Sequence, residues 1–169
     1  MDQFVRNFYR LLTGLSCLSM VAAFIIVLLG VLSRQVSFID IQGLDAYAGY
    51  AIAASLFFAL PGTLLKGDHI RVTLLLDRLP TRMRSAFEWF CLTLAMVLTV
   101  YVAWYSVRSV WISYITHDIS PAADASPLWI PQISMAVGCI GFAVAFVHAL
   151  VLHSRGKTLI TAAESARSE

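Results

Sequence analysis

Charged side chains are scarce in this sequence, and their scarcity excludes most classes of soluble protein. Lysine, arginine, aspartate and glutamate make up 13% of the 169 residues, while 59% of the residues are hydrophobic. Soluble domains contain about 25% charged and about 45–50% apolar residues. The composition therefore predicts an integral membrane protein. The net charge of +2 is too small to indicate nucleic-acid binding.

Residue types that build active sites are equally sparse. The three cysteines lie inside apolar stretches without paired spacing, so we interpret them as small buried hydrophobic residues: Cys17, Cys91 and Cys139. His148 lies well inside an apolar stretch but has no histidine at matching depth with which to bind haem. No Ser/His/Asp set or phosphate-binding glycine loop is evident. We expect neither an enzyme nor a cofactor-binding protein.

Four apolar stretches are each long enough to cross a bilayer, which takes about 20 residues. They cover about residues 11–32, 44–65, 86–107 or longer, and 128–152. Backbone polar groups in lipid must be satisfied within each segment, so we expect helices. The prediction is an all-α integral membrane protein with four transmembrane helices. It forms a single membrane domain over residues 1–169, with a tail over residues 153–169.

The basic residues predict how the chain is oriented. Ten of the twelve lie in the N-terminal segment, in the connector over residues 66–84, or in the tail. Lysine and arginine near the ends of spans favour the cytoplasmic side. We therefore expect both termini and the connector in the cytoplasm. Three charged residues near span ends are expected at the membrane interface: Asp45, Glu88 and Arg108.

The connector over residues 66–84 has the pattern of a short amphipathic helix. Apolar residues recur at helical spacing on one face, at Val72, Leu75, Leu76, Leu79 and Met83. Ile70 and Leu74 fall on the opposite face, and Pro80 would end the helix. The pattern therefore predicts a short helix over about residues 70–79. It is either an interfacial helix among lipid headgroups or a docking surface for a partner protein.

Two features predict how the spans pack. Small residues recur every fourth position on the second and fourth stretches, which lets helices approach closely, and we expect this packing within the chain: Gly49 and Ala53, then Gly141, Ala145 and Ala149. Arg34 and Asp45 close the ends of adjacent antiparallel helices. We expect the two side chains to form an ion pair.

Short motifs occur in a recognisable order along the chain. Gly67-Asp68-His69-Ile70-Arg71-Val72, followed by Leu79-Pro80, resembles the signature G-x-H-I-x-V…L-P. Arg34 follows the first span, and Asp45 stands where a glutamate is more usual. Ser126-Pro127-Leu128-Trp129-Ile130-Pro131 resembles S-P-x-L-x-I-P with one residue fewer. Over roughly residues 10–152 the chain thus resembles the small membrane subunit of tripartite ATP-independent periplasmic (TRAP) transporters, the DctQ-like family.

The resemblance marks a set of candidate partner-interface or family-motif residues. These are Arg34, Asp45, Gly67, His69, Ile70, Val72, Leu74, Pro80, Ser126, Pro127 and Pro131. It implies no catalytic residue, metal or cofactor. It implies that the connector braces an assembly in addition to lying at the cytoplasmic surface.

The resemblance also implies a three-part system in a bacterial inner membrane. A periplasmic solute-binding protein (DctP-like) captures an organic acid, and a large multi-span permease subunit (DctM-like) imports it with sodium. The small subunit is expected to be a scaffold in the lipid bilayer that packs against the permease. Loops near Asp40, His117, Asp118 and Asp124 either touch the binding protein or are solvated connectors. The alternatives are a stand-alone small oligomeric transporter or channel, and a membrane redox subunit.

Overall fold

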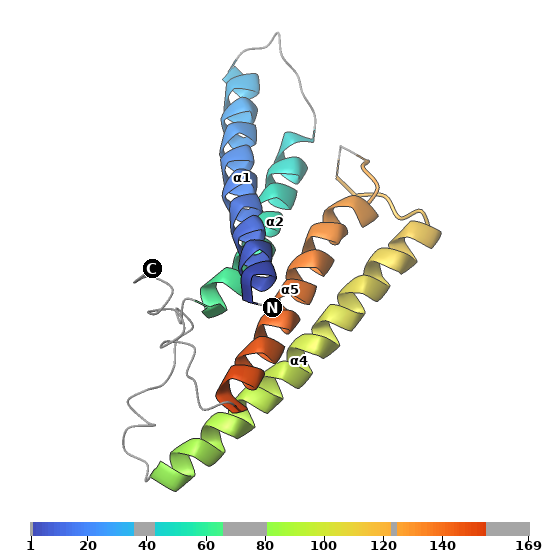
Figure 1. Cartoon of the computed structure of the whole chain (residues 1–169). Coiled ribbons are helices and arrows are strands. Elements are labelled where there is room, and N and C mark those ends of the chain that lie inside the picture. The colour runs from blue at the N-terminus through green and yellow to red at the C-terminus, as the bar shows by residue number, and fades with distance from the viewer. Residues whose placement is uncertain (1, 36–42, 66–80, 123–124, 155–169) are drawn as a thin grey trace.

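A computed structural model describes residues 2–35, 43–65, 81–122 and 125–154 (Figure 1). These residues form four helices: α1 (Asp2–Gln35), α2 (Leu44–Leu65), α4 (Thr81–Ile115) and α5 (Trp129–Ser154). All four are long and apolar enough to cross a membrane, and the described residues contain no strand. The predicted all-helical architecture with four spans is therefore confirmed. The expected helix over residues 70–79 lies outside the described residues and stays a prediction.

Two helices are longer than the apolar stretches that predicted them. α1 has 34 residues and α4 has 35. At 1.5 Å per residue, a helix of that size is about 52 Å long, against about 30 Å of bilayer hydrocarbon. The helices continue through their polar flanks because neither residues 2–13 nor residues 81–115 contain a glycine or proline. Helices of this length must tilt or project beyond the hydrocarbon.

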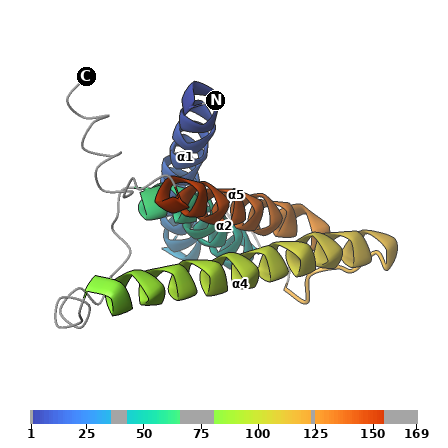
Figure 2. The ribbon, with the colours of Figure 1, turned by 60° about the horizontal axis from the view of Figure 1, so that its bottom comes forward.

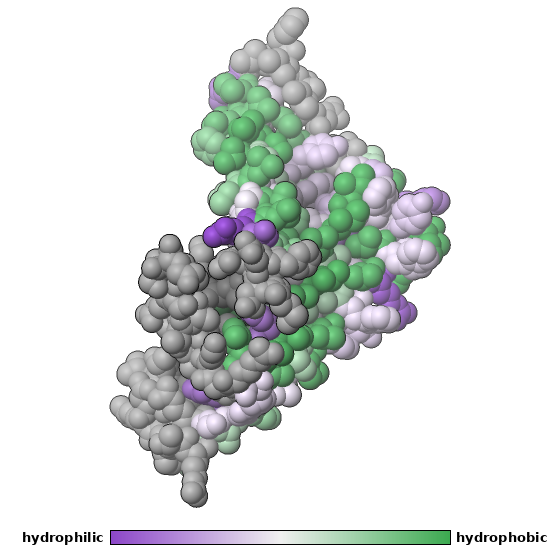
Figure 3. Space-filling view, in the orientation of Figure 1, coloured by the Kyte–Doolittle hydropathy of each residue, from purple (hydrophilic) through white to green (hydrophobic). Residues whose placement is uncertain are grey.

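The helices lie in a row with α2 and α5 at its centre. α2 packs against α1 and α5, and α5 packs against α4 (Figures 1 and 2). A central helix is more buried than the edge helices: 39% of the most apolar stretch of α5 is buried, against 11% in α1 and in α4. The edge helices therefore leave wide apolar faces uncovered, and apolar residues cover much of the face drawn in Figure 3.

Two clusters of buried residues connect the row. One joins α1, α2 and α5, and consists of Tyr9, Leu64, Ala145 and Phe146. The other joins α4 and α5, and consists of Ala103, Cys139 and Ala143. Cys139 is buried as predicted, but Cys17 and Cys91 are exposed. The prediction was wrong for these two because they lie on the uncovered faces of the edge helices α1 and α4.

Glycines in α5 allow the closest helix contacts. A Cβ added at Gly138 would lie 2.5 Å from the backbone oxygen of Phe57 in α2. One added at Gly141 would lie 2.8 Å from Cδ1 of Leu12 in α1 and 3.0 Å from Cγ of Pro61 in α2. Helices can approach this closely only where no side chain intervenes. α5 therefore packs directly on the backbone of α2.

The two predicted rows of small residues have different surroundings. Gly141, Ala145 and Ala149 are buried, so this row packs within the chain as predicted. Gly49 is exposed, and a Cβ added there would meet nothing within 4 Å. Gly49 therefore does not pack against the described helices, and the prediction was wrong for that position, whereas Ala53 of the same row is half-buried.

Candidate functional site

The described motif residues lie at one end of the bundle, where α1 and α4 end and α2 and α5 begin (Figure 1). We call this the loop end. It contains Arg34, Asp45, Ser126, Pro127 and Pro131. The other predicted motif residues lie outside the described residues: Gly67, His69, Ile70, Val72, Leu74 and Pro80. The candidate site is therefore built from the loop end alone.

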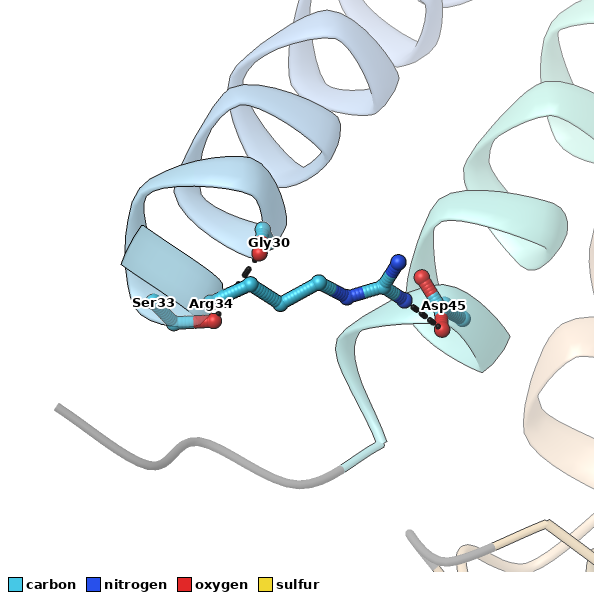
Figure 4. Close-up of polar contacts among 4 residues, drawn as sticks. All are labelled: Gly30, Ser33, Arg34 and Asp45. Carbon is cyan, nitrogen blue, oxygen red and sulfur yellow. Dashed lines mark hydrogen bonds and ion pairs between the residues drawn. The ribbon is translucent and has the colours of Figure 1, made fainter. Parts of the chain in front are cut away.

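Arg34 and Asp45 form the predicted ion pair. Arg34 is in the last turn of α1 and Asp45 in the first turn of α2, and Nη2 of Arg34 donates to Oδ2 of Asp45 at 2.7 Å (Figure 4). Each charge also suits its own helix terminus, since a carboxylate is favoured at a helix N-terminus and a cation at a C-terminus. The contact is confirmed, whereas a role for the pair in binding a partner stays a prediction.

The ion pair is too exposed to hold the two helices together by itself. The side chains of Arg34 and Asp45 are 71% and 83% exposed. Ion pairs in water contribute at most about 1 kcal/mol. In the same turn of α1, the hydroxyl of Ser33 donates to the carbonyl of Gly30 at 3.0 Å (Figure 4). The charged groups are thus available at the surface of the loop end.

The segment after α4 reverses direction through a left-handed residue. His117 has φ 53°, and the N–H of Asp118 donates to the carbonyl of Ser113 at 3.1 Å. This bond matches the Schellman pattern, in which a left-handed residue closes a helix C-terminus. Glycine usually occupies that position because a side chain is strained there. α4 therefore ends in a defined turn although no glycine is present.

The chain then folds back on itself before α5 begins. Ile119 and Pro127 form an isolated antiparallel bridge. The N–H of Ser120 donates to the carbonyl of Ser126 at 2.8 Å, and the N–H of Leu128 donates to that of Asp118 at 3.0 Å. The Ser-Pro motif thus closes a short hairpin through its backbone.

A hydrogen bond between side chains attaches this hairpin to α2. The hydroxyl of Tyr50, in the second turn of α2, donates to Oγ of Ser120 at 2.8 Å. Ser120 is buried, and its Oγ also accepts from the N–H of Ala122 at 3.2 Å. These residues were not predicted as part of the site. The available signal was a tyrosine hydroxyl within an apolar stretch, which usually has a hydrogen-bond partner when it is buried.

The first turn of α5 is fixed by Pro131, by a backbone hydrogen bond to Pro127 and by an aromatic contact. Pro131 is the third helical residue, where its missing N–H has no intrahelical partner to lose. The N–H of Ile130 donates to the carbonyl of Pro127 at 3.3 Å. The rings of Tyr114 and Trp129 meet edge to face, with centroids 5.7 Å apart. The end of α4 is thereby held against the start of α5.

The polar groups elsewhere in the described bundle do not form a recognisable reaction centre. Among the described residues, no group of three or more His, Cys, Asp and Glu side chains could hold a metal ion. Within residues 2–35, 43–65, 81–122 and 125–154, three buried polar atoms have no hydrogen-bond partner: Tyr9 Oη, Gln132 Oε1 and His148 Nδ1. Chemically, the loop end therefore offers exposed opposite charges beside a hydrogen-bonded hairpin, which is a surface suited to contact.

The sequence matches a known family over most of its length. The profile described as "Tripartite ATP-independent periplasmic transporters, DctQ component" matches residues 23–156. A comparison with curated proteins finds no match. The matched region contains all four helices in whole or in part, together with the loop end.

Proposed function

We propose a function from one premise: the chain belongs to the DctQ family, the small membrane component of TRAP transporters. We infer that it is a structural subunit and not an enzyme, and that it packs against the large multi-span permease subunit. The family match over residues 23–156 carries this proposal. The uncovered apolar faces of α1 and α4 support it, because they supply surface for a partner in the membrane.

In the proposed system, the large subunit moves an organic acid inward with sodium after a periplasmic binding protein has captured it. The small subunit braces the permease in a bacterial inner membrane. The serines among the buried residues support a packing role, since a serine hydroxyl carries no charge: Ser55, Ser106, Ser113 and Ser120. The hydroxyl of Ser106, for example, donates to the carbonyl of Val102 in its own helix at 2.8 Å.

Co-purification from native membranes tests the proposed assembly. The chain carries a C-terminal tag, mild detergent preserves complexes, and mass spectrometry identifies the partners. One large multi-span permease is expected in about equal amount. Recovery of the chain alone, or only as a homo-oligomer, would contradict the proposal and favour the stand-alone transporter.

Reconstitution in liposomes separates the two transport hypotheses. Uptake of labelled organic acids is expected with the complete assembly and binding protein, only under an inward sodium gradient. The small chain alone is expected to carry none. Uptake by the small chain alone would contradict the structural role.

We also propose that both termini and the connector over residues 66–84 face the cytoplasm and that the loop end faces the periplasm. The distribution of lysine and arginine in the sequence supports this orientation. Single cysteines at Thr116 and Ser154, both exposed and at opposite ends of the bundle, test it once the native cysteines are replaced by alanine. An impermeant maleimide added to spheroplasts is expected to label position 116 and not position 154. The reverse labelling would overturn the orientation.

A further inference from the structure

A groove of about 280 Å³ lies between α4 and α5 near the loop end. α4 contributes Val107, Val110, Trp111 and Tyr114, and α5 contributes Trp129 and Val137 among others. The α4 residues fall within the stretch from Ser85 to Ile115 that is apolar enough to cross a membrane. The groove therefore belongs to a part of α4 that is apolar enough to contact lipid.

The lining of the groove selects for an apolar occupant of small cross-section. The surface that faces the groove is entirely apolar, so a polar solute would lose its hydration without gaining hydrogen bonds. A partner helix, with a diameter of about 10–12 Å, would occupy a space of this size only with its side chains. A single acyl chain meets both conditions.

A cation stands beside the groove. Arg108 directly follows Val107 and precedes Trp111 by three positions, so it lies on the flank of the groove-lining face of α4. It is exposed and makes no ion pair within the part of the chain that the structure describes. Seven residues separate it from the end of α4, which is about 10 Å along the helix. A guanidinium at this depth is costly unless it reaches the interface or meets an anion.

The aromatic residues at the loop end indicate where lipid headgroups lie. Trp111 is exposed, and Tyr114 packs edge to face on Trp129 at the same end of the groove. Tryptophan and tyrosine favour the depth of the lipid headgroups. The long side chain of Arg108 can extend towards that level. A phosphate there can accept two parallel N–H bonds from its guanidinium.

We propose that this groove holds one acyl chain of a phospholipid whose phosphate binds to Arg108. The lipid belongs to the leaflet at the loop end. The site is specific for the combination of a phosphate and an apolar chain, because the arginine and the groove each recognise one part of the molecule. The proposal does not depend on which protein partner the chain has.

Native mass spectrometry of the full chain in detergent, with any co-purified partner retained, tests the site. The probes are dioleoyl phosphatidylglycerol and dioleoylglycerol, which share their chains but differ in the phosphate-containing headgroup. One phosphatidylglycerol is expected to remain bound per chain, at least about tenfold more tightly than dioleoylglycerol. Equal retention of the two probes would overturn the role of the phosphate.

Substitutions test the two parts of the proposed site, Arg108 and the apolar groove, independently. Arg108→Gln is expected to reduce phosphatidylglycerol binding to the level of dioleoylglycerol, whereas Val137→Phe, which fills the groove, reduces the binding of both. Arg10→Gln is the matched control, since Arg10 is an exposed arginine of α1 far from the groove, and is expected to retain the lipid. Arg108→Lys keeps the charge but loses the two-pronged contact, and is expected to bind with intermediate affinity.

Four results with these variants and with the assembly would contradict the proposal. Undiminished binding by Arg108→Gln, or an equal loss in Arg10→Gln, would show that the lipid is not held by Arg108. Undiminished binding by Val137→Phe would place the chain outside the groove. Absence of any lipid from a folded assembly, with α4 crosslinked to a partner through position 107, would show that protein covers the groove instead. Circular dichroism verifies that each variant is folded.

Discussion

Substituting Gly138 by alanine should push the two central helices, α2 and α5, apart, because the added Cβ would collide with Phe57 of α2. The added Cβ would lie 2.5 Å from the oxygen of Phe57, and 2.6 Å from both its carbonyl carbon and its Cβ. Non-bonded carbon atoms normally approach to about 3.5–4.0 Å. The obstructing atoms include backbone, so they move only if α2 moves. α2 and α5 would therefore have to shift apart.

The expected loss of stability in Gly138→Ala follows from two opposing effects. Overpacking a core typically costs about 1–3 kcal/mol, and contact with backbone favours the upper part of that range. Alanine in place of glycine gains about 1 kcal/mol of intrinsic helix stability. We expect Gly138→Ala to be destabilised by about 1–2 kcal/mol, which changes the unfolding equilibrium by a factor of about 5–30. Gly49→Ala is the matched control, because nothing lies within 4 Å of its added Cβ, and it should be unchanged or more stable.

The buried thiol of Cys139 reports unfolding beside the substituted position. With the exposed Cys17 and Cys91 replaced by serine, reaction of Cys139 with a maleimide dye is followed as sodium dodecyl sulfate is added. Gly138→Ala should react at a lower detergent fraction than the parent chain, and Gly49→Ala should not. Equal midpoints for the two alanine variants would refute the backbone contact.

Gly141 provides a second comparison, because its nearest neighbour is the end of a flexible side chain. A Cβ there would lie 2.8 Å from Cδ1 of Leu12. Shortening Leu12 to alanine should therefore rescue part of the defect of Gly141→Ala, which a double-mutant cycle would detect as coupling. Phe57→Ala should not rescue Gly138→Ala, since the backbone of Phe57 remains in place. Rescue in both pairs would contradict the distinction between a side-chain contact at Gly141 and a backbone contact at Gly138.

Three further predictions concern the loop end. Asp45→Asn should reduce the free energy of unfolding by no more than about 1 kcal/mol. Cys139 labelling would also show whether removing Arg34 from this variant reduces stability further. A larger loss in Asp45→Asn would mean that the pair is shielded from water. Tyr50→Phe should reduce the free energy of unfolding by about 1 kcal/mol and speed hydrogen exchange at the amides of Ser120 and Ala122. Unchanged exchange would argue that this hydrogen bond does not attach the hairpin to α2. His117→Gly should be more stable than His117→Val by about 1–2 kcal/mol because of the left-handed backbone, and equal stabilities would argue against that conformation.

The number and type of helices were predictable because bilayer thickness sets the length of an apolar stretch. Their ends were not, since hydropathy falls where the polar flank begins while helical hydrogen bonding continues. α1 therefore begins at Asp2 and not near residue 11. α2 differs, because its first residue is preceded by Gly43, whose φ of 85° prevents the helix from extending further.

The arrangement of the helices was not readable from composition. Gly49 and Gly138 are both small residues in apolar helices, yet only Gly138 contacts another backbone. Cys17 and Cys139 are likewise both thiols in apolar stretches, and only Cys139 is buried. Hydropathy cannot separate a face that meets lipid from one that meets another helix, because both are equally apolar.

The two contacts at the loop end illustrate which parts of a site can be predicted. Arg34 and Asp45 are eleven residues apart at the ends of two consecutive helices, so the connection itself brings opposite charges together. Tyr50 and Ser120 are 70 residues apart, and their contact depends on the packing of α2 against α5. No local pattern encodes that packing. The motif resemblance therefore identified the segment but not the hydrogen bond that fixes it.

The central helices and the edge helices of the row have different roles: the first stabilise the fold, and the second contact the surroundings. The central helices α2 and α5 are joined at Gly138, and the Tyr50–Ser120 hydrogen bond attaches α2 to the hairpin that precedes α5. The edge helices α1 and α4 carry most of the uncovered apolar surface. Substitutions in the central pair should therefore alter folding and partner binding together. Substitutions on uncovered faces, such as the one that holds Trp104, should alter association with lipid or protein while the unfolding midpoint stays the same, because the side chain they change has few contacts within the chain.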